Sequence, residues 1–91
     1  MALCIYFPVK GMSADKYEEA LRRLEGEGQG APPGRSYHVS FTAGDGLQVV
    51  DVWDSQESFD AFGQTLMPIL TELGIDPGQP AIGEVHNIIE G

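Results

Sequence analysis

The sequence predicts an α+β protein whose elements follow the order strand–helix–strand–strand–helix–strand. Two short segments that are apolar on both faces, residues 3–7 and 47–53, predict the central strands of its sheet. Two segments with helical apolar periodicity, residues 13–26 and 55–74, predict the helices. Because two helices can cover only one face of such a sheet, we expect the other face to bind a second copy of the chain.

The composition bounds the class of protein and its partners. The chain has 91 residues, 42% of them hydrophobic and 21% charged, which is typical of one globular domain over residues 1–91. Asp and Glu number 14 against 5 Lys and Arg, so the net charge is −9. This charge repels phosphate backbones and anionic lipid surfaces. We therefore expect neither nucleic acid nor a membrane as a partner.

The single cysteine, Cys4, lies within the first apolar strand and has no internal partner for a disulfide. This position is typical of a small buried hydrophobic side chain rather than a reactive thiol. No stretch approaches the ~20 apolar residues of a membrane span, and the run 2–9 is too short for a signal peptide. We expect a soluble protein of a reducing compartment, the cytoplasm.

The first helix is predicted to begin after Ser13, a typical N-cap, and to end at Gly26. Met12 and Tyr17 flank this cap at the spacing of a hydrophobic staple. The apolar stripe of the helix comprises Tyr17, Ala20, Leu21 and Leu24. Residues 26–34 are rich in glycine and proline and predict a flexible connection, with a lid over a pocket as the functional alternative.

Residues 35–42 alternate between polar and apolar side chains and precede Gly44-Asp45-Gly46, a strong hairpin signal. A two-residue turn at Asp45-Gly46 is the favoured interpretation, and it places His38 opposite Trp53. A three-residue loop would instead place Tyr37 opposite Trp53. The two registers therefore put different side chains of this strand on the face of Trp53.

The second helix is predicted to begin near Ser55 and to end at Gly74, a typical residue just past a helix end. Pro68 lies within it, where we expect a bend or a break into two short helices. Its apolar stripe comprises Phe59, Phe62, Leu66, Ile69, Leu70 and Leu73. Residues 82–89 alternate again and predict the last strand.

This order of elements is that of the ferredoxin-like split βαβ fold: a four-stranded antiparallel sheet, order 4-1-3-2, with two helices on one face. In that order the first and third strands are central, which agrees with their continuous apolar character. The second and fourth are edges, which agrees with their alternation. A homodimer would bury the helix-free face, and at ~25 cal/mol per Å² this burial could rival the stability of the monomer.

The segment 49–59, Val-Val-Asp-Val-Trp-Asp-Ser-Gln-Glu-Ser-Phe, resembles the third-strand-to-second-helix segment of the dimeric α/β-barrel superfamily. Its members often show an acid two residues before a Trp, as Asp51 and Trp53 stand here, and then an acidic or Ser N-cap. The superfamily includes antibiotic-biosynthesis-type monooxygenases, muconolactone-isomerase-like proteins and haem-degrading monooxygenases. The remaining elements are similar in order and length over nearly the whole chain.

The chain also resembles uncharacterised small bacterial members with a Pro-Pro-Gly-Arg-x-Tyr-His second strand and a His-Asn-Ile-Ile ending, here residues 32–38 and 86–89. The resemblance implies a dimeric α/β barrel whose pocket takes a small aromatic or polyketide-like metabolite. It implies a monooxygenase or isomerase that needs no cofactor. Haem degradation is disfavoured, because residues 60–64 hold no His and residues 3–7 no Asn, where haem-degrading relatives use them.

His38 is the candidate general acid or base, and Asp51 is its candidate catalytic partner. The favoured register places Ser40 opposite Asp51 and Trp53 beside His38, so that the four side chains would share one sheet face. Such a set suits a pocket for a planar organic molecule. The alternative is that His38 only forms hydrogen bonds across the sheet or to a partner subunit.

Tyr6, Phe62 and His86 join Trp53 and Ser40 as predicted substrate-binding residues. Three of them have a plainer alternative: Trp53 as a core or interface anchor, Tyr6 as a half-buried strand residue, and His86 as a surface residue of an edge strand. No spacing of the H-x-H or C-x-x-C kind is present, so we expect no metal site.

The sequence leaves open whether the protein is an enzyme. The alternatives are a non-catalytic dimer that binds a small molecule and a structural or stress-related dimer. A pocket of at least ~300 Å³ reached by His38 or His86 would favour catalysis or binding. An interior filled by the large aromatic side chains would favour the structural alternative; these are Phe41, Phe59, Phe62 and Trp53.

Overall fold

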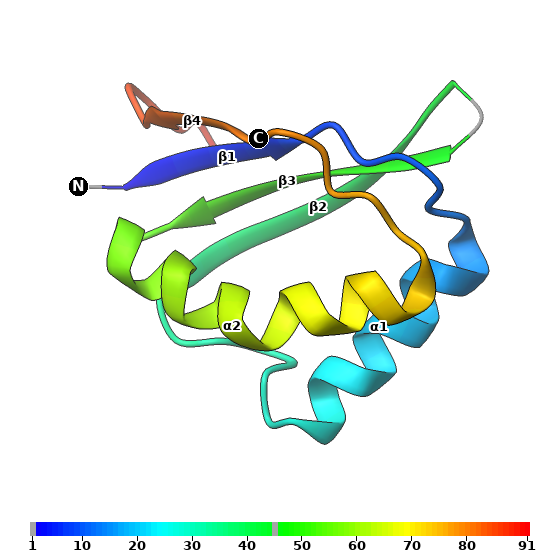
Figure 1. Ribbon diagram of the computed structural model, residues 1–91. Coiled ribbons are helices and arrows are strands. Elements are labelled where there is room, and N and C mark those ends of the chain that lie inside the picture. The colour runs from blue at the N-terminus through cyan, green and yellow to red at the C-terminus, as the bar shows by residue number, and fades with distance from the viewer. Residues whose placement is uncertain (1, 45) are drawn as a thin grey trace.

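The computed structural model describes residues 2–44 and 46–91. A four-stranded antiparallel sheet lies over two helices, and both helices cover the same face of the sheet (Figure 1). In chain order the elements are β1 (Leu3–Phe7), α1 (Ala14–Gly26), β2 (Arg35–Ala43), β3 (Gly46–Trp53), α2 (Gln56–Leu73) and β4 (Ala81–Glu84). The predicted α+β class and order of elements are confirmed.

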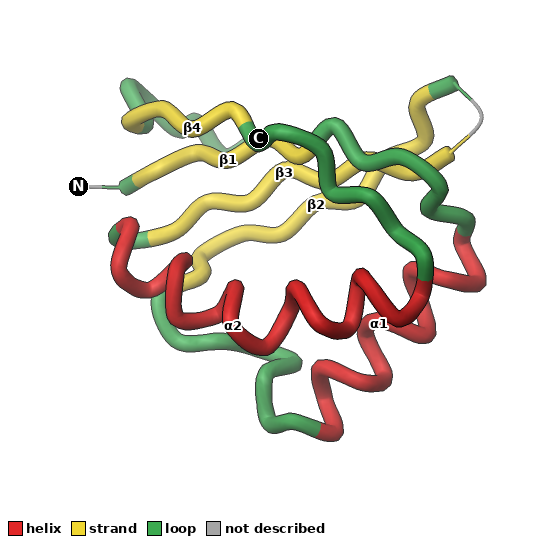
Figure 2. The backbone as a smooth tube through the Cα atoms, in the orientation of Figure 1, coloured by secondary structure: helices red, strands yellow, loops and turns green. Residues whose placement is uncertain are grey.

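The strands lie in the order β2-β3-β1-β4, which is the predicted order read from the other edge (Figure 2). β1 pairs with β3 on one side and β4 on the other, and β3 lies between β1 and β2. The two segments predicted to be central are therefore the central strands. A central strand has neighbours on both edges, and its continuous apolar sequence reflects this position.

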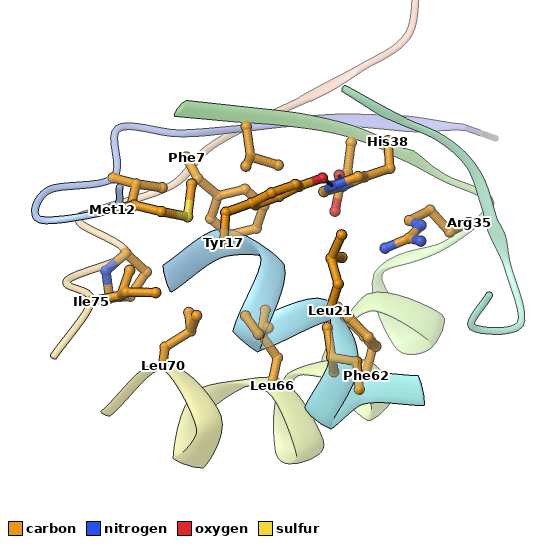
Figure 3. A pocket seen from close by; sticks show the side chains of 16 residues that line it. Phe7, Met12, Tyr17, Leu21, Arg35, His38, Phe62, Leu66, Leu70 and Ile75 are labelled. Atoms are coloured by element: carbon orange, nitrogen blue, oxygen red, sulfur yellow. Dashed lines mark hydrogen bonds and ion pairs between the residues drawn. The ribbon is translucent and has the colours of Figure 1, made fainter. Parts of the chain in front are cut away.

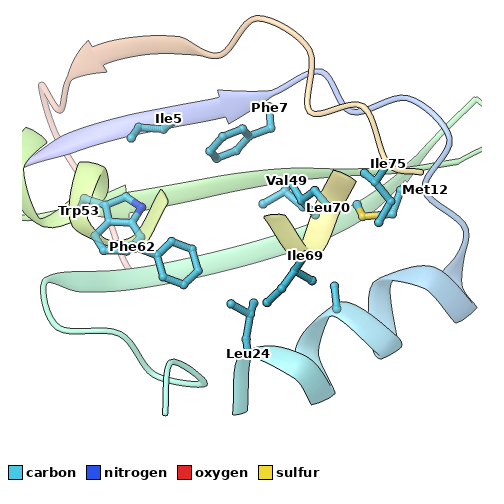
Figure 4. Close-up of a cluster of buried hydrophobic side chains, with 11 residues drawn as sticks. Ile5, Phe7, Met12, Leu24, Val49, Trp53, Phe62, Ile69, Leu70 and Ile75 are labelled. Carbon is cyan, nitrogen blue, oxygen red and sulfur yellow. The ribbon is translucent and has the colours of Figure 1, made fainter. Parts of the chain in front are cut away.

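The hydrophobic core lies between the sheet and the helices (Figure 4). Its buried side chains come from both layers: Ile5, Phe7, Val49 and Trp53 from the sheet, and Ala20, Leu24, Phe62, Ile69 and Leu70 from the helices. Ile5 and Trp53 are 0% exposed. Full burial of a side chain of this kind contributes roughly 1.5–3 kcal/mol, so this layer holds the helices on one face.

The predicted helix caps are confirmed. The Ser13 hydroxyl accepts a hydrogen bond from the Lys16 amide at 3.3 Å, and the Ser55 hydroxyl accepts one from the Ser58 amide at 3.1 Å. At the other end of α2, Gly74 has φ +71°, the left-handed conformation that glycine adopts without steric cost.

The break expected at Pro68 is wrong, because α2 continues through this residue to Leu73. Proline cannot donate to the carbonyl one turn earlier, that of Gln64. Both Pro68 and Gln64 lie on the exposed side of the helix, where water can satisfy that carbonyl. The next two residues, Ile69 and Leu70, are buried in the core, and their packing holds the helix together past the proline.

Both predicted registers of the β2–β3 hairpin are wrong. Ala43 pairs with Gly46, so residues 44 and 45 separate the strands; Asp45 of the predicted turn lies outside the described residues. His38 consequently lies opposite Asp51 rather than opposite Trp53. The observed pairing differs from the favoured one by two positions, and an even shift leaves every side chain on its predicted face.

An irregularity near Ser36 changes the register at the start of β2. Tyr37 pairs with Val52, whereas Arg35 pairs with Trp53, so one extra residue lies on the β2 side. A bulge of this kind redirects the neighbouring side chain. Arg35 is thereby brought to the helix-facing side of the sheet, the side of Trp53.

The predicted last strand is wrong in its second half, because β4 ends at Glu84 and residues 85–91 have no regular secondary structure. Glu84 pairs with Leu3, the first residue of β1, and the Val85 amide then donates to the carbonyl of Ala2 at 2.9 Å. The neighbouring strand has ended at this point, so the ladder cannot continue.

The C-terminal segment, residues 85–91, reaches the helix-free face of the sheet. The Tyr37 hydroxyl donates to Oε2 of Glu90 at 2.5 Å, and this carboxylate raises the pKa of Tyr37. Large apolar side chains remain exposed nearby, with Val39 at 52% and Ile89 at 79%. The others are Tyr37, Phe41 and Ile88. An apolar surface of this kind is typical of a contact between proteins.

Gly34 is the residue before β2 where the fold leaves no room for a side chain. It has φ +91°, and an added Cβ would lie 2.6 Å from both the Asp54 Oδ1 and the Ser58 side chain. Gly28 also has a positive φ, +76°, but an added Cβ there meets nothing within 4 Å. An alanine at Gly28 would therefore meet backbone strain alone, whereas an alanine at Gly34 would meet backbone strain and steric overlap.

We expect Gly34→Ala to lower the free energy of unfolding by about 3 kcal/mol, since strain and overlap add. Gly28→Ala should lower it by only about 1 kcal/mol, from the backbone term alone. Urea denaturation of both variants measures the difference. Equal losses would show that the contact of Gly34 with Asp54 and Ser58 is not tight.

Candidate functional site

Four polar side chains form one hydrogen-bonded chain on the helix side of the sheet. Tyr17 comes from α1, His38 from β2, and Asp51 and Trp53 from β3. The Tyr17 hydroxyl lies 2.7 Å from His38 Nε2, and His38 Nδ1 lies 2.6 Å from Asp51 Oδ1 (Figure 3). Trp53 Nε1 donates to the second oxygen, Asp51 Oδ2, at 3.3 Å.

Strand alternation, strand pairing and the packing of α1 on the sheet bring these residues together. Asp51 and Trp53 are two positions apart in β3 and so point to the same face, and the pairing of β2 with β3 sets His38 directly opposite Asp51. Tyr17 belongs to the apolar stripe of α1 that faces the sheet. Three separate elements therefore supply one site.

The Asp51 carboxylate fixes the protonation pattern of this chain. Asp51 is 3% exposed, and a buried carboxylate is stable only when its oxygens accept hydrogen bonds. An ionised carboxylate only accepts, so His38 donates to it from Nδ1. In the neutral imidazole, Nε2 is then the acceptor, and it receives the hydrogen bond that the Tyr17 hydroxyl donates.

A cavity of about 70 Å³ lies beside His38 and Asp51, between the sheet and the two helices (Figure 3). Its walls are mainly apolar, among them Phe7, Met12, Leu21, Phe62, Leu66 and Leu70. The polar side chains at its wall are Tyr17, Arg35, His38 and Asp51. A volume of this size lies well below the ~300 Å³ at which ligand pockets begin.

Arg35 points toward the cavity from the start of β2 (Figure 3). Its guanidinium carbon lies 5.7 Å from the centroid of the Phe62 ring, a cation–π distance, and Nη2 donates to the Gly30 carbonyl at 3.3 Å. Within residues 2–44 and 46–91 it forms no ion pair with a carboxylate, unlike Arg22 and Arg23.

The structure brings together part of the predicted site. His38, Asp51 and Phe62 line the cavity. Trp53 packs beside it, with its ring centroid 5.2 Å from that of Phe62, and bonds Asp51. Ser40 lies on the same sheet face opposite Val49, two pairs farther along the hairpin than His38, and outside the cavity lining.

Two predicted residues lie away from this site. Tyr6 pairs with Val50 on the helix-free face, where its hydroxyl donates to Gln48 Oε1, because β1 alternates and Ile5 and Phe7 take the helix side. His86 is exposed and follows the end of β4. The aromatic interior is also smaller than expected, since Phe41 pairs with Gln48 and lies on the helix-free face.

Sequence reasoning missed Tyr17 and Arg35. Tyr17 belongs to a helical apolar stripe, where an aromatic side chain is expected to pack, and only the folded structure shows its hydroxyl reaching His38. Arg35 follows a Pro-Pro-Gly turn, and its inward direction depends on the bulge near Ser36. The one available signal was that Arg35 stands apart from the other basic residues of the chain.

Solved structures share this fold. SnoaB, a cofactor-independent oxygenase from Streptomyces nogalater, matches with a TM-score of 0.63 and 18% identity, over 99% of this chain and 96% of SnoaB. A conserved protein from Methanosarcina mazei Go1 matches with a TM-score of 0.63 and 14% identity, over 92% of each chain. A Chloroflexus aurantiacus protein assigned to the antibiotic biosynthesis monooxygenases has a TM-score of 0.57, 16% identity, and coverage of 98% and 95%.

The chain has the fold of these monooxygenase-like proteins. The resemblance predicted from residues 49–59 is thus confirmed for the fold. No family model matches the sequence, and no curated protein matches it. Neither described helix could cross a membrane, and no three metal-binding side chains gather within residues 2–44 and 46–91.

We expect His38 and Asp51 to be energetically coupled, because each satisfies the buried polar group of the other. His38→Gln and Asp51→Asn should each cost about 2 kcal/mol of unfolding free energy, whereas the double variant should cost about 1 kcal/mol less than their sum. Urea denaturation of the four proteins measures this coupling. As a control, Ser40→Ala combined with Asp51→Asn should be additive, and additive behaviour of the His38 pair would contradict the coupling.

Proposed function

We propose that the protein is a cofactor-independent oxygenase or isomerase that acts on a small aromatic metabolite, with His38 as its proton acceptor. The observation that carries this proposal is the His38 imidazole, held by the buried Asp51 carboxylate at the wall of an apolar cavity. A fold shared with SnoaB, an oxygenase described as cofactor-independent, supports the same class of chemistry.

The residues suit proton abstraction from a weakly acidic C–H or O–H group. His38 Nε2 accepts the proton, and the Asp51 carboxylate stabilises the imidazolium that forms. Trp53 holds the other oxygen of Asp51 and so fixes the direction of the carboxylate. Apolar walls exclude water, which strengthens these electrostatic interactions and protects the substrate anion from reprotonation.

Both reaction classes start from the same anion. In isomerisation, His38 returns the proton to a different carbon of the substrate. In oxygenation, the substrate anion reduces O₂, one oxygen atom stays as a ketone on the former CH₂ group, and the other leaves as water. The substrate carbon supplies all four electrons as its two C–H bonds break, and its two hydrogens end in the water molecule, so no external reductant is consumed.

The proposed assembly is a homodimer through the helix-free face. Support comes from the exposed apolar side chains of β2, chiefly Tyr37 and Val39, together with Ile88 and Ile89 of the C-terminal segment. Surfaces of this kind seldom stay exposed in a monomer. A chain of this size also buries only a modest fraction of its surface alone, so pairing would add substantially to its stability.

The second candidate is a non-catalytic dimer, and the cavity volume favours it. About 70 Å³ is far short of a pocket for an aromatic metabolite. Trp53, Phe59 and Phe62 pack against one another with centroids 5.7 and 5.2 Å apart, as expected of a filled core. Turnover of a defined substrate separates the two candidates.

The activity is tested with a thermal-shift screen of hydroxyaromatic and polyketide-like compounds, followed by turnover assays with and without oxygen. His38→Gln should lower kcat for any substrate found by about 10²–10⁴-fold, because it removes the proton acceptor. The matched control is His86→Gln, which changes the other histidine, outside the site, and should keep full activity. Full activity of His38→Gln would contradict the proposed role of His38.

Assembly is tested by sedimentation equilibrium over a range of protein concentrations. Val39→Glu places a buried charge in the proposed interface, and we expect the dimer to weaken at least about 100-fold. The control Ala61→Glu adds the same charge to an exposed position of α2 and should leave the dimer intact. A wild-type protein that stays monomeric at all concentrations would exclude this assembly.

A further inference from the structure

Tyr17 occupies the place that a substrate needs. Of the two ring nitrogens of His38, Nδ1 is bonded to Asp51 and Nε2 to the Tyr17 hydroxyl. The planes of the Tyr17 and His38 rings are nearly parallel, with an interplanar angle of 2° and centroids 5.9 Å apart. A ligand can therefore reach the proton-accepting nitrogen only by taking over the position of a phenol hydroxyl.

The size of the cavity also indicates that Tyr17 must move before a ligand can bind. A cavity that admits benzene in another protein measures about 150 Å³, whereas this one measures about 70 Å³. An aromatic ring can enter only if a wall side chain moves. Phe62, Leu70 and Met12 are buried in the core, whereas Tyr17, Leu21 and Leu66 are only partly buried. Of these three, Tyr17 is the one whose side chain occupies the proton-accepting nitrogen of His38.

The charge at the cavity indicates what enters. Arg35 is a cation at an apolar wall, and among the described residues it has no carboxylate partner, although the chain carries a net charge of −9. A buried or half-buried cation favours a nearby anion. Arg35 and His38 both line this cavity from β2, so an anionic oxygen formed at His38 would lie in the field of Arg35.

We propose that Tyr17 is a gate, a side chain that must move before a ligand can enter this cavity. In the closed state its phenol occupies the position that a hydroxyaromatic ligand with an acidic hydroxyl group takes when it binds. The Tyr17 side chain swings out, and the ligand O–H takes its place at His38. The proton moves from the ligand oxygen to Nε2, leaving His38 as an imidazolium paired with Asp51 and the ligand as an oxyanion paired with Arg35. This inference deepens the proposed function, since it rests on His38 as the proton acceptor.

The test uses Tyr17→Ala and the probe 4-nitrophenol, whose visible absorption reports its ionisation. We expect Tyr17→Ala to bind the probe at least about tenfold more tightly than the wild type, because the gate no longer competes. The bound probe should be the anion at a pH where the free probe is mostly neutral. 4-Nitroanisole, which has no acidic proton, should bind without this gain.

Leu21→Ala is the matched control, since it also enlarges the cavity but leaves Tyr17 bonded to His38. It should bind 4-nitrophenol less than about threefold more tightly than the wild type. Equal gains in Leu21→Ala and Tyr17→Ala would overturn the gate, because volume alone would then explain binding. Within the Tyr17→Ala protein, His38→Gln should abolish probe ionisation and Arg35→Gln should weaken anion binding about tenfold.

A second variant keeps the proposal testable if Tyr17→Ala does not fold. Tyr17→Phe keeps the ring and removes only the hydroxyl, so the gate loses its hydrogen bond and probe affinity should rise about fivefold. An unchanged or weaker affinity would overturn the gate. Tight binding of the anion by Tyr17→Ala without turnover of any hydroxyaromatic compound would support the gate and contradict the proposed enzyme, so the two proposals fail separately.

Discussion

The buried carboxylate of Asp51 is the constraint on which the site depends. A carboxylate at 3% exposure on a central strand is costly to bury unless both oxygens accept hydrogen bonds. Trp53 and His38 supply these bonds from the same strand and from its neighbour. Their geometry in turn fixes which nitrogen of His38 carries the proton and directs the other toward Tyr17. The hydrogen bonds that stabilise this one carboxylate therefore fix the positions of four side chains from three elements.

Strand alternation explains why the sheet face of each side chain could be predicted from the sequence, whereas the residue opposite it on the next strand could not. The even difference between the favoured and observed registers left His38, Asp51 and Trp53 on one face, as predicted. Which residue lies opposite His38 depends on how the chain connects Ala43 to Gly46, and a Gly-Asp sequence is compatible with several turn types. The end of β4 likewise depends on where its neighbour β1 ends. The alternation of residues 82–89 alone carries no information about the length of that neighbouring strand.

Two further features, the unbroken helix α2 and the hydrogen bond of Tyr17, depend on tertiary packing. Pro68 disfavours a helix by itself, yet Ile69 and Leu70 are buried on the core side and hold α2 in one piece. Tyr17 was predicted only as an apolar packing residue, in the stripe and the staple of α1, because its hydrogen bond spans 21 positions of the chain. Local propensity thus places the elements, whereas the polar contacts among them appear only after the helices pack on the sheet.

Strand β2 contributes side chains to both faces of the sheet, so a contact on one face can affect the site on the other. Tyr37 and Val39 flank His38 in β2 and point away from it, toward the helix-free side. A second subunit packed on these side chains would restrain β2, an edge strand that pairs only with β3. The 2.6 Å contact between His38 and Asp51 joins these same two strands. Formation of the proposed dimer would therefore also hold the imidazole against its carboxylate, and a monomer would leave that contact to an unsupported edge strand.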